Sequence, residues 1–359
     1  MLSFRFKQYF KLIAASVIFW SLAFGVFIMV RYFAGGSEEG IDISQSNEAP
    51  VTDWLDFALY LGIAVGFVYG TVEFVFNRLL SKWLAVWLSL IIRALIYLIF
   101  LIFSLTFVSH YLKSSMDLDL PTHSGWWKNS HAFWLVVGYF MLCSLLFTLF
   151  RMMNERYSSG KLFNMLFGKY RRPVEEDKIF MFLDLKSSTT IAERLGHLKY
   201  SKLIQDCFFD LNRILGKYNA EVYQYVGDEA VISWDFKSGL KNRRCVNIYF
   251  DFDRLLNRRA RYYQKRYGLI PVFKAGVHGG TLIVTEVGAV KKELAYHADG
   301  INTTARIQAE CNKYDTSFLI SEELLNEMYL KPFYKTEKIG GIALKGKQEL
   351  TYLYSIEAL

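Results

Sequence analysis

Four stretches within the first 150 residues carry almost no charge, and each is long enough, or nearly so, to cross a lipid bilayer as a helix. They are residues 12–30, 57–72, 83–109 and 132–150, and only Arg93 interrupts the third. A helix of about 20 apolar residues spans the roughly 30 Å of hydrocarbon in a bilayer. These stretches are apolar on all sides, unlike a helix on the surface of a soluble domain. The sequence therefore predicts an all-α transmembrane bundle of four spans, with membrane lipid around it.

Arg93 is the one charge inside these stretches. A charged side chain is costly in hydrocarbon, so it faces other helices or extends toward the lipid headgroups. Glu73, near the end of the preceding span, is the candidate partner in sequence. Two interpretations stay open: an ion pair with Glu73, or an unpaired arginine that reaches the membrane interface.

Lysine and arginine flank alternate ends of the spans. They precede the first span, separate the second from the third, and follow the fourth: Arg5, Lys7, Lys11, Arg78, Lys82, Arg151, Arg156, Lys161, Lys169, Arg171 and Arg172. The loops around 35–53 and 110–130 are acidic or mixed. The positive-inside rule then predicts a multi-pass protein of a cell inner membrane or plasma membrane, with both termini cytoplasmic.

The net charge of +8 comes largely from these membrane flanks and does not indicate nucleic acid. The basic run at 258–266 falls in an expected helix, where a solvated or lipid-facing surface is favoured over nucleic-acid contact. The predicted organisation is a transmembrane domain at 1–151, a cytoplasmic linker at 152–176 and a C-terminal domain at 177–359.

In the C-terminal half, strand and helix patterns alternate. We expect a strand at 179–185, a short helix ending at Gly196, a helix through 204–215, a hairpin at Gly227 and Asp228, a long helix at 246–266, a strand pair within 272–287, a helix at 301–312, a strand at 317–321 and closing strands through Tyr354. Helices interleaved with hairpins predict an α/β domain with helices on a mostly antiparallel sheet.

Two aspartates in this half are set at expected strand ends, Asp184 in FLDL and Asp228 in VGDE. Each has a simpler interpretation, a helix-entry residue for Asp184 and a hairpin turn for Asp228. Closely spaced carboxylates are also the ligands that divalent ions prefer in phosphoryl chemistry. Asn302 and Arg306 lie one helical turn apart, so both reach the same face, where an arginine stabilises developing negative charge.

The order of these motifs resembles the class III adenylate and guanylate cyclase catalytic domain, from about residue 178 to 356. The resemblance rests on FLDL with Asp184, on Gly227-Asp228, on KAGVHGG at 274–280, on Asn302 and Arg306, and on Lys345 in ALKGK. Together they are far more specific than any one of them.

The resemblance implies a ferredoxin-like core and a homodimer whose two sites lie between the protomers. Asp184, the backbone carbonyl of Leu185 and Asp228 would hold two Mg²⁺ or Mn²⁺ per site. Asn302 and Arg306 would serve the transition state, and Lys345 the terminal phosphates of a nucleoside triphosphate. The implied reaction is attack of the ribose 3′ hydroxyl on the α-phosphorus, with release of pyrophosphate.

Two positions depart from the adenylate cyclase pattern. Where that pattern has a lysine and an aspartate or threonine against adenine, this chain has Gln224 and Ala295. We expect ATP as substrate, on family frequency more than on these residues, with side activity on GTP. The alternatives are a guanylate or relaxed-specificity cyclase, or a catalytically silent cyclase-like scaffold. The VGDE hairpin also suggests diguanylate cyclases, but Asn302, Arg306 and ALKGK have no place in that pattern.

Overall fold

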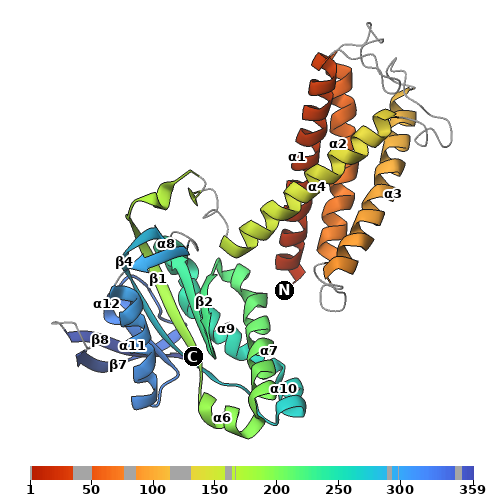
Figure 1. The fold of residues 1–359 in the computed structure, drawn as a ribbon. Helices are drawn as coiled ribbons and strands as arrows, with labels where there is room; N and C mark the ends of the chain where they lie inside the picture. The colour runs from red at the N-terminus through yellow and green to blue at the C-terminus, as the bar shows by residue number, and fades with distance from the viewer. Residues whose placement is uncertain are drawn as a thin grey trace. The chain divides into compact units, whose positions relative to one another are not determined.

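The computed structural model describes residues 2–34, 51–76, 86–113, 131–157, 164–165, 167–288, 293–297, 299–343 and 350–359. The chain divides into two compact units, Met1–Met153 and Asn154–Leu359. Figure 1 shows helices alone in the first unit and a sheet with helices in the second.

The first unit contains four long helices: α1 (Leu2–Ala34), α2 (Val51–Val75), α3 (Val86–Lys113) and α4 (His131–Tyr157). Three contain segments long and apolar enough to cross a membrane, Tyr9–Val30, Val51–Val75 and Ile91–Val108, whereas the apolar part of α4 is the shorter Phe133–Thr148. The predicted all-α character is confirmed. Among the described residues three spans meet the length and composition of a membrane helix, and the fourth stays a prediction.

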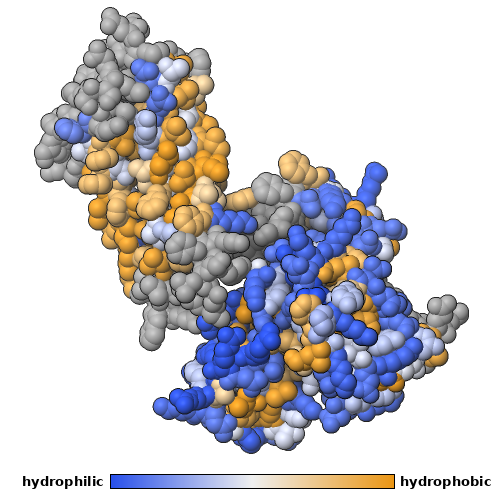
Figure 2. Space-filling view, turned by 180° about the vertical axis from the view of Figure 1, so that it is seen from behind, coloured by the Kyte–Doolittle hydropathy of each residue, from blue (hydrophilic) through white to orange (hydrophobic). Residues whose placement is uncertain are grey.

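The face of this unit that Figure 2 shows is largely apolar where its residues are coloured. Leu22 on α1 is 66% exposed and Ile99 on α3 is 65% exposed. A soluble protein rarely exposes apolar side chains over so large an area, so this surface fits a lipid environment.

Helices α1 and α2 pack with their backbones in close approach, because glycines recur every fourth residue on α2. A Cβ atom on Gly62 would lie 2.3 Å from the Cα of Ser21, and one on Gly66 would lie 2.5 Å from the Cα of Val17. Small residues at this spacing are the usual means of close helix packing in membranes. The glycine face of α2 therefore packs against α1 of the same chain.

Arg93 pairs with Glu73 inside the unit, so the predicted ion pair is confirmed and the unpaired alternative is wrong. The Arg93 Nη1 atom lies 2.9 Å from Glu73 Oε1, and the Tyr97 hydroxyl donates to the same oxygen at 3.0 Å. Glu73 is only 4% exposed.

The second unit contains a single sheet of eight strands among the described residues. The strands are β1 (Val174–Leu185), β2 (Glu221–Val226), β3 (Glu229–Asp235), β4 (Phe273–Val287), β5 (Glu293–His297), β6 (Phe318–Ser321), β7 (Tyr334–Ala343) and β8 (Leu350–Ala358). Their order is β2-β3-β1-β4-β6-β8-β7, and β5 pairs with β4. The β4–β6 pair is parallel and the other described pairs are antiparallel. The predicted mostly antiparallel sheet is confirmed.

Helices cover both faces of this sheet (Figure 1). They are α6 (Ser188–Leu195), α7 (His197–Leu215), α8 (Phe236–Leu240), α9 (Arg244–Arg258), α10 (Ala260–Tyr267), α11 (Asp299–Lys313) and α12 (Glu322–Asn326), with short 3₁₀ turns at Lys169–Arg171, Gly216–Tyr218 and Lys241–Arg243. Residues alternate between the faces of a strand. Met181 and Leu183 of β1 therefore join the main core with α7 and α9, whereas Phe180 and Phe182 face the side that carries α11.

The expected strand pair within 272–287 is wrong, because β4 is one continuous strand. Every residue of β1 pairs with it, from Val174 opposite Val284 to Leu185 opposite Phe273. Gly279 is needed here for packing and makes no turn. A Cβ atom there would lie 2.8 Å from the Phe236 ring.

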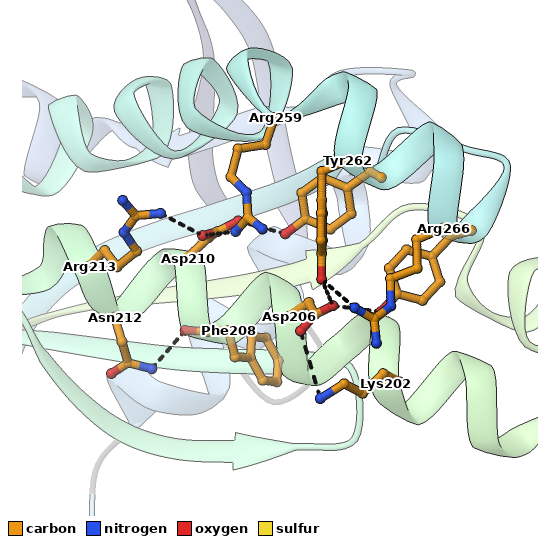
Figure 3. Close-up of polar contacts among 11 residues, drawn as sticks. Lys202, Asp206, Phe208, Asp210, Asn212, Arg213, Arg259, Tyr262 and Arg266 are labelled. Carbon is orange, nitrogen blue, oxygen red and sulfur yellow. Dashed lines mark hydrogen bonds and ion pairs between the residues drawn. The ribbon is translucent and has the colours of Figure 1, made fainter. Parts of the chain in front are cut away.

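The expected long helix at 246–266 is broken into α9 and α10 at Arg259, whose backbone angles (φ −97°, ψ 14°) are not helical. The Arg259 guanidinium binds the carboxylate of Asp210, which is fully buried on α7, and the Tyr263 hydroxyl donates to the same carboxylate at 2.7 Å. The hydroxyls of Tyr262 and Tyr267 both donate to Asp206 at 2.6 Å. Figure 3 shows these contacts between α7 and the segment of Arg259 and α10. Several side chains of the basic run therefore hold α10 against α7.

Candidate active site

Asp184 lies at the carboxyl end of β1, a strand that pairs with β3 on one side and with β4 on the other. Glu229 of β3 and Lys274 of β4 pair with it on either side, and paired residues of neighbouring strands point to the same face. The Lys274 Nζ atom lies 3.1 Å from Asp184 Oδ2. The Gln308 amide of α11 donates to the same oxygen at 3.1 Å. The Asp184 carboxylate is thus held in place from two elements.

Asp228 lies in the tight turn between β2 and β3, directly before Glu229. Gly227 precedes it with φ +60°, a conformation that favours glycine. The turn places the Asp228 carboxylate close to that of Asp184, near enough for it to contribute to the raised pKa of Asp184. Both aspartates predicted from the sequence are therefore brought together, although 44 positions separate them along the chain.

Burial and mutual repulsion act on the acids of this cluster. Burial raises the pKa of Asp184, and although Lys274 lowers it, the nearby Asp228 carboxylate adds to the rise. Burial and the charges of Asp184 and Asp228 raise the pKa of Glu229 to about 7. Burial, with Asp228 close by, likewise raises the pKa of Tyr200 to about 12. Crowded carboxylates with raised pKa values mark a place where a cation is favourable.

These carboxylates fit divalent ions whose remaining ligands come from water and from the phosphates of a substrate. Within the described ranges, no group of three or more His, Cys, Asp or Glu converges to enclose a metal by itself. Mg²⁺ is commonly bound by one or two carboxylates, with water and substrate phosphates completing its shell. Asp184 and Asp228 supply two such carboxylates. The side chain of Leu185 is buried in the core, so its backbone carbonyl is the group that it has to offer.

Asn302 and Arg306 lie on α11 but do not face this cluster. Gln308, which reaches Asp184, is two residues beyond Arg306 and so lies roughly on the opposite side of the helix. Asn302 is exposed. The Arg306 Nη1 atom is shielded from solvent and has no hydrogen-bond partner among the residues that the structure describes. One chain therefore presents two separate sets of groups.

Comparison with known proteins matches residues 173–357 to the adenylate and guanylate cyclase catalytic domain. This is just over half of the chain, and it includes all the motifs described above. The chain belongs to this family.

Two relatives illustrate the extent of the cyclase likeness. Adenylate cyclase 2 of Rhizobium meliloti (strain 1021) is 33% identical over 195 residues, which are 54% of this chain and 54% of that protein. The chain thus spans about half the length of the curated relative that it matches. The structure of a bacterial light-regulated adenylyl cyclase has a TM-score of 0.51 at 16% identity, and the match covers 62% of this chain and 65% of that one. The second likeness shows a shared fold alone.

The two residues predicted to contact the base, Gln224 and Ala295, point to opposite faces of the sheet. Gln224 is exposed on β2 and follows a bulge at Tyr223. The Tyr223 ring meets that of Tyr296, on β5, at 4.8 Å. Ala295 precedes Tyr296 and pairs with Thr285, so its side chain points to the other face of the sheet. Lys345, the expected phosphate ligand, lies outside the described residues.

Sequence reasoning gave no role to two residues that touch Asp184, namely Lys274 and Gln308. Lys274 stands in the KAGVHGG motif, and a lysine on a strand that is otherwise buried was the available signal. For Gln308 the signal was a polar residue on the inner face of an amphipathic helix, two positions from Arg306. The contact of Lys274 follows only from the register of β1 with β4, and the contact of Gln308 only from the packing of α11 on the sheet.

Proposed function

We propose that this protein is a membrane-bound adenylate cyclase that converts ATP to 3′,5′-cyclic AMP and pyrophosphate at the interface of a homodimer. One observation carries the proposal. Asp184 and Asp228 meet at one edge of the sheet, while Asn302 and Arg306 lie on the side of α11 that faces away from them. Each chain thus offers two incomplete halves of a site, and a second copy related by a two-fold axis would complete both.

In this proposal the residues take the following roles. Asp184, Asp228 and the Leu185 carbonyl would hold two Mg²⁺ or Mn²⁺, which when bound spread the negative charge of the triphosphate. Asn302 of the partner protomer orients the ribose. Arg306 of the partner protomer stabilises the charge that develops as the 3′ oxygen bonds to the α-phosphorus and pyrophosphate leaves. Lys345 binds the terminal phosphates of the nucleoside triphosphate.

The membrane assignment rests on the apolar outer surface of the helical unit and on its three long apolar helices. The alternation of basic and acidic flanks favours cytoplasmic termini, and the cytoplasm holds nucleoside triphosphates and magnesium. We therefore propose a multi-pass protein of a cell inner membrane or plasma membrane, with the cyclase domain cytoplasmic.

One observation favours a second substrate. The exposed Gln224 amide both donates and accepts, so it suits guanine as well as adenine, and Ala295 adds no polar group. A site with few polar groups leaves little unsatisfied when the wrong base enters. Guanylate or relaxed-specificity cyclase activity is thus the alternative. Rates with ATP, GTP, CTP and UTP distinguish the two.

The test of the shared site is complementation between inactive chains. Asp228→Ala and Arg306→Ala homodimers should each be inactive, and mixed dimers should regain activity because one of their two sites is intact. The matched control mixes Asp184→Ala with Asp228→Ala. Both changes strike the same half, so every site in that mixture lacks an aspartate and activity should stay absent.

Activity is measured as cyclic AMP formed from ATP with Mn²⁺, with heterodimers purified by two different affinity tags. A purified Asp228→Ala/Arg306→Ala heterodimer without activity would contradict the shared site. A wild-type protein that binds nucleotide but forms no cyclic product from any of the four triphosphates would instead support a silent cyclase-like scaffold.

A further inference from the structure

Helix α11 lies very close to the sheet at Gln308. A Cβ atom on Gly276 of β4 would lie 2.3 Å from the Gln308 backbone nitrogen and 2.6 Å from its Cα atom. Real side chains do not tolerate such distances, so only glycine allows α11 to lie this close to β4. Gly276 pairs with Phe182, two residues before Asp184. The close approach thus brings Gln308 within reach of the end of β1.

The Gln308 side chain is 6% exposed and its amide nitrogen donates to Asp184 Oδ2 at 3.1 Å. A second link runs through Lys274, whose Nζ atom lies 3.1 Å from the same Oδ2 atom and 3.1 Å from Asn312 Oδ1. Asn312 is one turn beyond Gln308 on α11. The inner face of this helix therefore fixes the Asp184 carboxylate both directly and through Lys274.

The contacts from Gln308 and Lys274 both engage Oδ2, and neither engages the other oxygen of the carboxylate. A carboxylate whose one oxygen is held by donors presents its second oxygen in a defined direction. Residues that orient a metal ligand in this way commonly contribute about 10-fold to 100-fold in metal affinity. The Gln308 amide is suited to this role because it donates without carrying a charge.

We propose that Gln308 is a positioning residue, which orients Asp184 of its own chain for metal binding while the opposite side of the same helix presents Asn302 and Arg306 to the other site of the dimer. This inference rests on the proposed function for the use of both sites. Because Gln308 donates a hydrogen bond to Asp184 of its own chain, its effect is confined to the site that contains this Asp184. Among the residues that the structure describes, the Gln308 side chain donates its hydrogen bond to Asp184, so Gln308 acts in cis on the metal half.

The first experiment measures Mn²⁺ binding to the full-length protein without nucleotide, by electron paramagnetic resonance of the free ion. Gln308→Met keeps the length of the side chain but removes its donor. We expect about 10-fold weaker Mn²⁺ binding or more. Gln264→Met, at an exposed position of α10, is the matched control and should bind as the wild type does. Gln308→Ala, which cannot clash, serves if the methionine variant does not fold.

The second experiment uses dimers with a single intact site. One chain carries Arg306→Ala and supplies Asp184, and the other carries Asp184→Ala and supplies Arg306. Adding Gln308→Met to the first chain should raise the Mn²⁺ concentration at half-maximal rate by about 10-fold, and adding it to the second should leave that concentration unchanged. A purely structural role for Gln308 in α11 would affect both placements alike.

Equal effects in both placements, or unchanged Mn²⁺ binding in Gln308→Met and Gln308→Ala, would overturn the inference. A wild type that binds Mn²⁺ but forms no cyclic nucleotide would refute the proposed function alone, since the binding measurement still judges Gln308. A wild type that binds no Mn²⁺ would overturn the metal assignment and this inference together.

Discussion

The Arg93 guanidinium lies 2.9 Å from the Glu73 carboxylate and joins α3 to α2 inside the helical unit. Their side chains are 14% and 5% exposed. Removing one partner of a buried pair strands the other charge, which costs about 3–5 kcal/mol. We expect Glu73→Gln and Arg93→Gln each to destabilise the unit strongly, and the double variant to cost clearly less than their sum.

The measurement is a double-mutant cycle on the detergent-solubilised full-length protein, followed by tryptophan fluorescence during denaturation. Asp53→Asn, at the start of α2, combined with Arg93→Gln is the control and should be additive, because Asp53 lies about 30 Å along α2 from Glu73, the partner of Arg93. Additivity of Glu73→Gln with Arg93→Gln would mean that the pair contributes nothing as a pair.

Gly66 should tolerate no side chain. A Cβ atom there would lie 2.5 Å from the Cα of Val17, whereas one on Gly138 of α4 meets nothing within 4 Å. Gly66→Val should therefore force α1 and α2 apart and destabilise the unit by about 1–3 kcal/mol or more. Gly138→Val is matched in helix propensity and should be nearly neutral. Equal unfolding midpoints for the two variants would refute the close packing of α1 on α2.

Asp184→Ala and Asp228→Ala should each abolish cyclic nucleotide formation, because each change removes one of the two carboxylates proposed to hold the metal ions. The fold and the dimer should persist, as judged by circular dichroism and size-exclusion chromatography. Asp177→Ala, on the same strand as Asp184 and exposed, is the control and should stay active. Turnover near the wild-type rate in either site variant would remove the two-metal assignment.

Asp251 gives a pH dependence of stability. Partial burial raises the pKa of its carboxyl, but hydrogen bonds from Lys217, Tyr218 and Arg254 outweigh this and lower the pKa to about 2. A depressed folded pKa means that the stabilisation is present above the unfolded pKa of about 3.9 and is lost as the pH falls toward 2. Asp251→Asn should thus be less stable than the wild type at pH 7, and the difference should shrink between pH 5 and pH 2. Urea midpoints across that range check it, and a constant difference would contradict the assignment.

Gln224 and Ala295 should influence base selectivity. We expect Gln224→Lys with Ala295→Asp to raise the ratio of ATP to GTP turnover, since both restore polar groups typical of adenylate cyclases. Because Ala295 faces away from the Tyr223 and Tyr296 rings, Gln224→Lys should contribute most of the change. Steady-state rates of the two single variants and the double variant with ATP and GTP test this, and a larger effect from Ala295→Asp would reverse the ranking.

Local patterns were sufficient for the helical unit and for most elements of the sheet. Uncharged stretches indicate helices in lipid whatever surrounds them, and Asp184, Asp228, Asn302 and Arg306 stand in motifs whose spacing is local. These features could be predicted because each depends on neighbours within one or two turns of the chain. The same local reasoning misjudged β4 and the helix broken at Arg259, where Gly279 and Asp210 act through residues distant in sequence.

By itself, the sequence determined the family of the C-terminal domain and that apolar helices precede it, since both follow from residue type and spacing. Only the tertiary structure decided that Glu73 pairs with Arg93, and that Lys274 and Gln308 hold Asp184 while Asn302 and Arg306 face elsewhere. The reason is physical. Which side chains meet depends on strand register and on how closely a helix approaches a sheet, and Gly276 sets that approach through backbone contacts that no local pattern records.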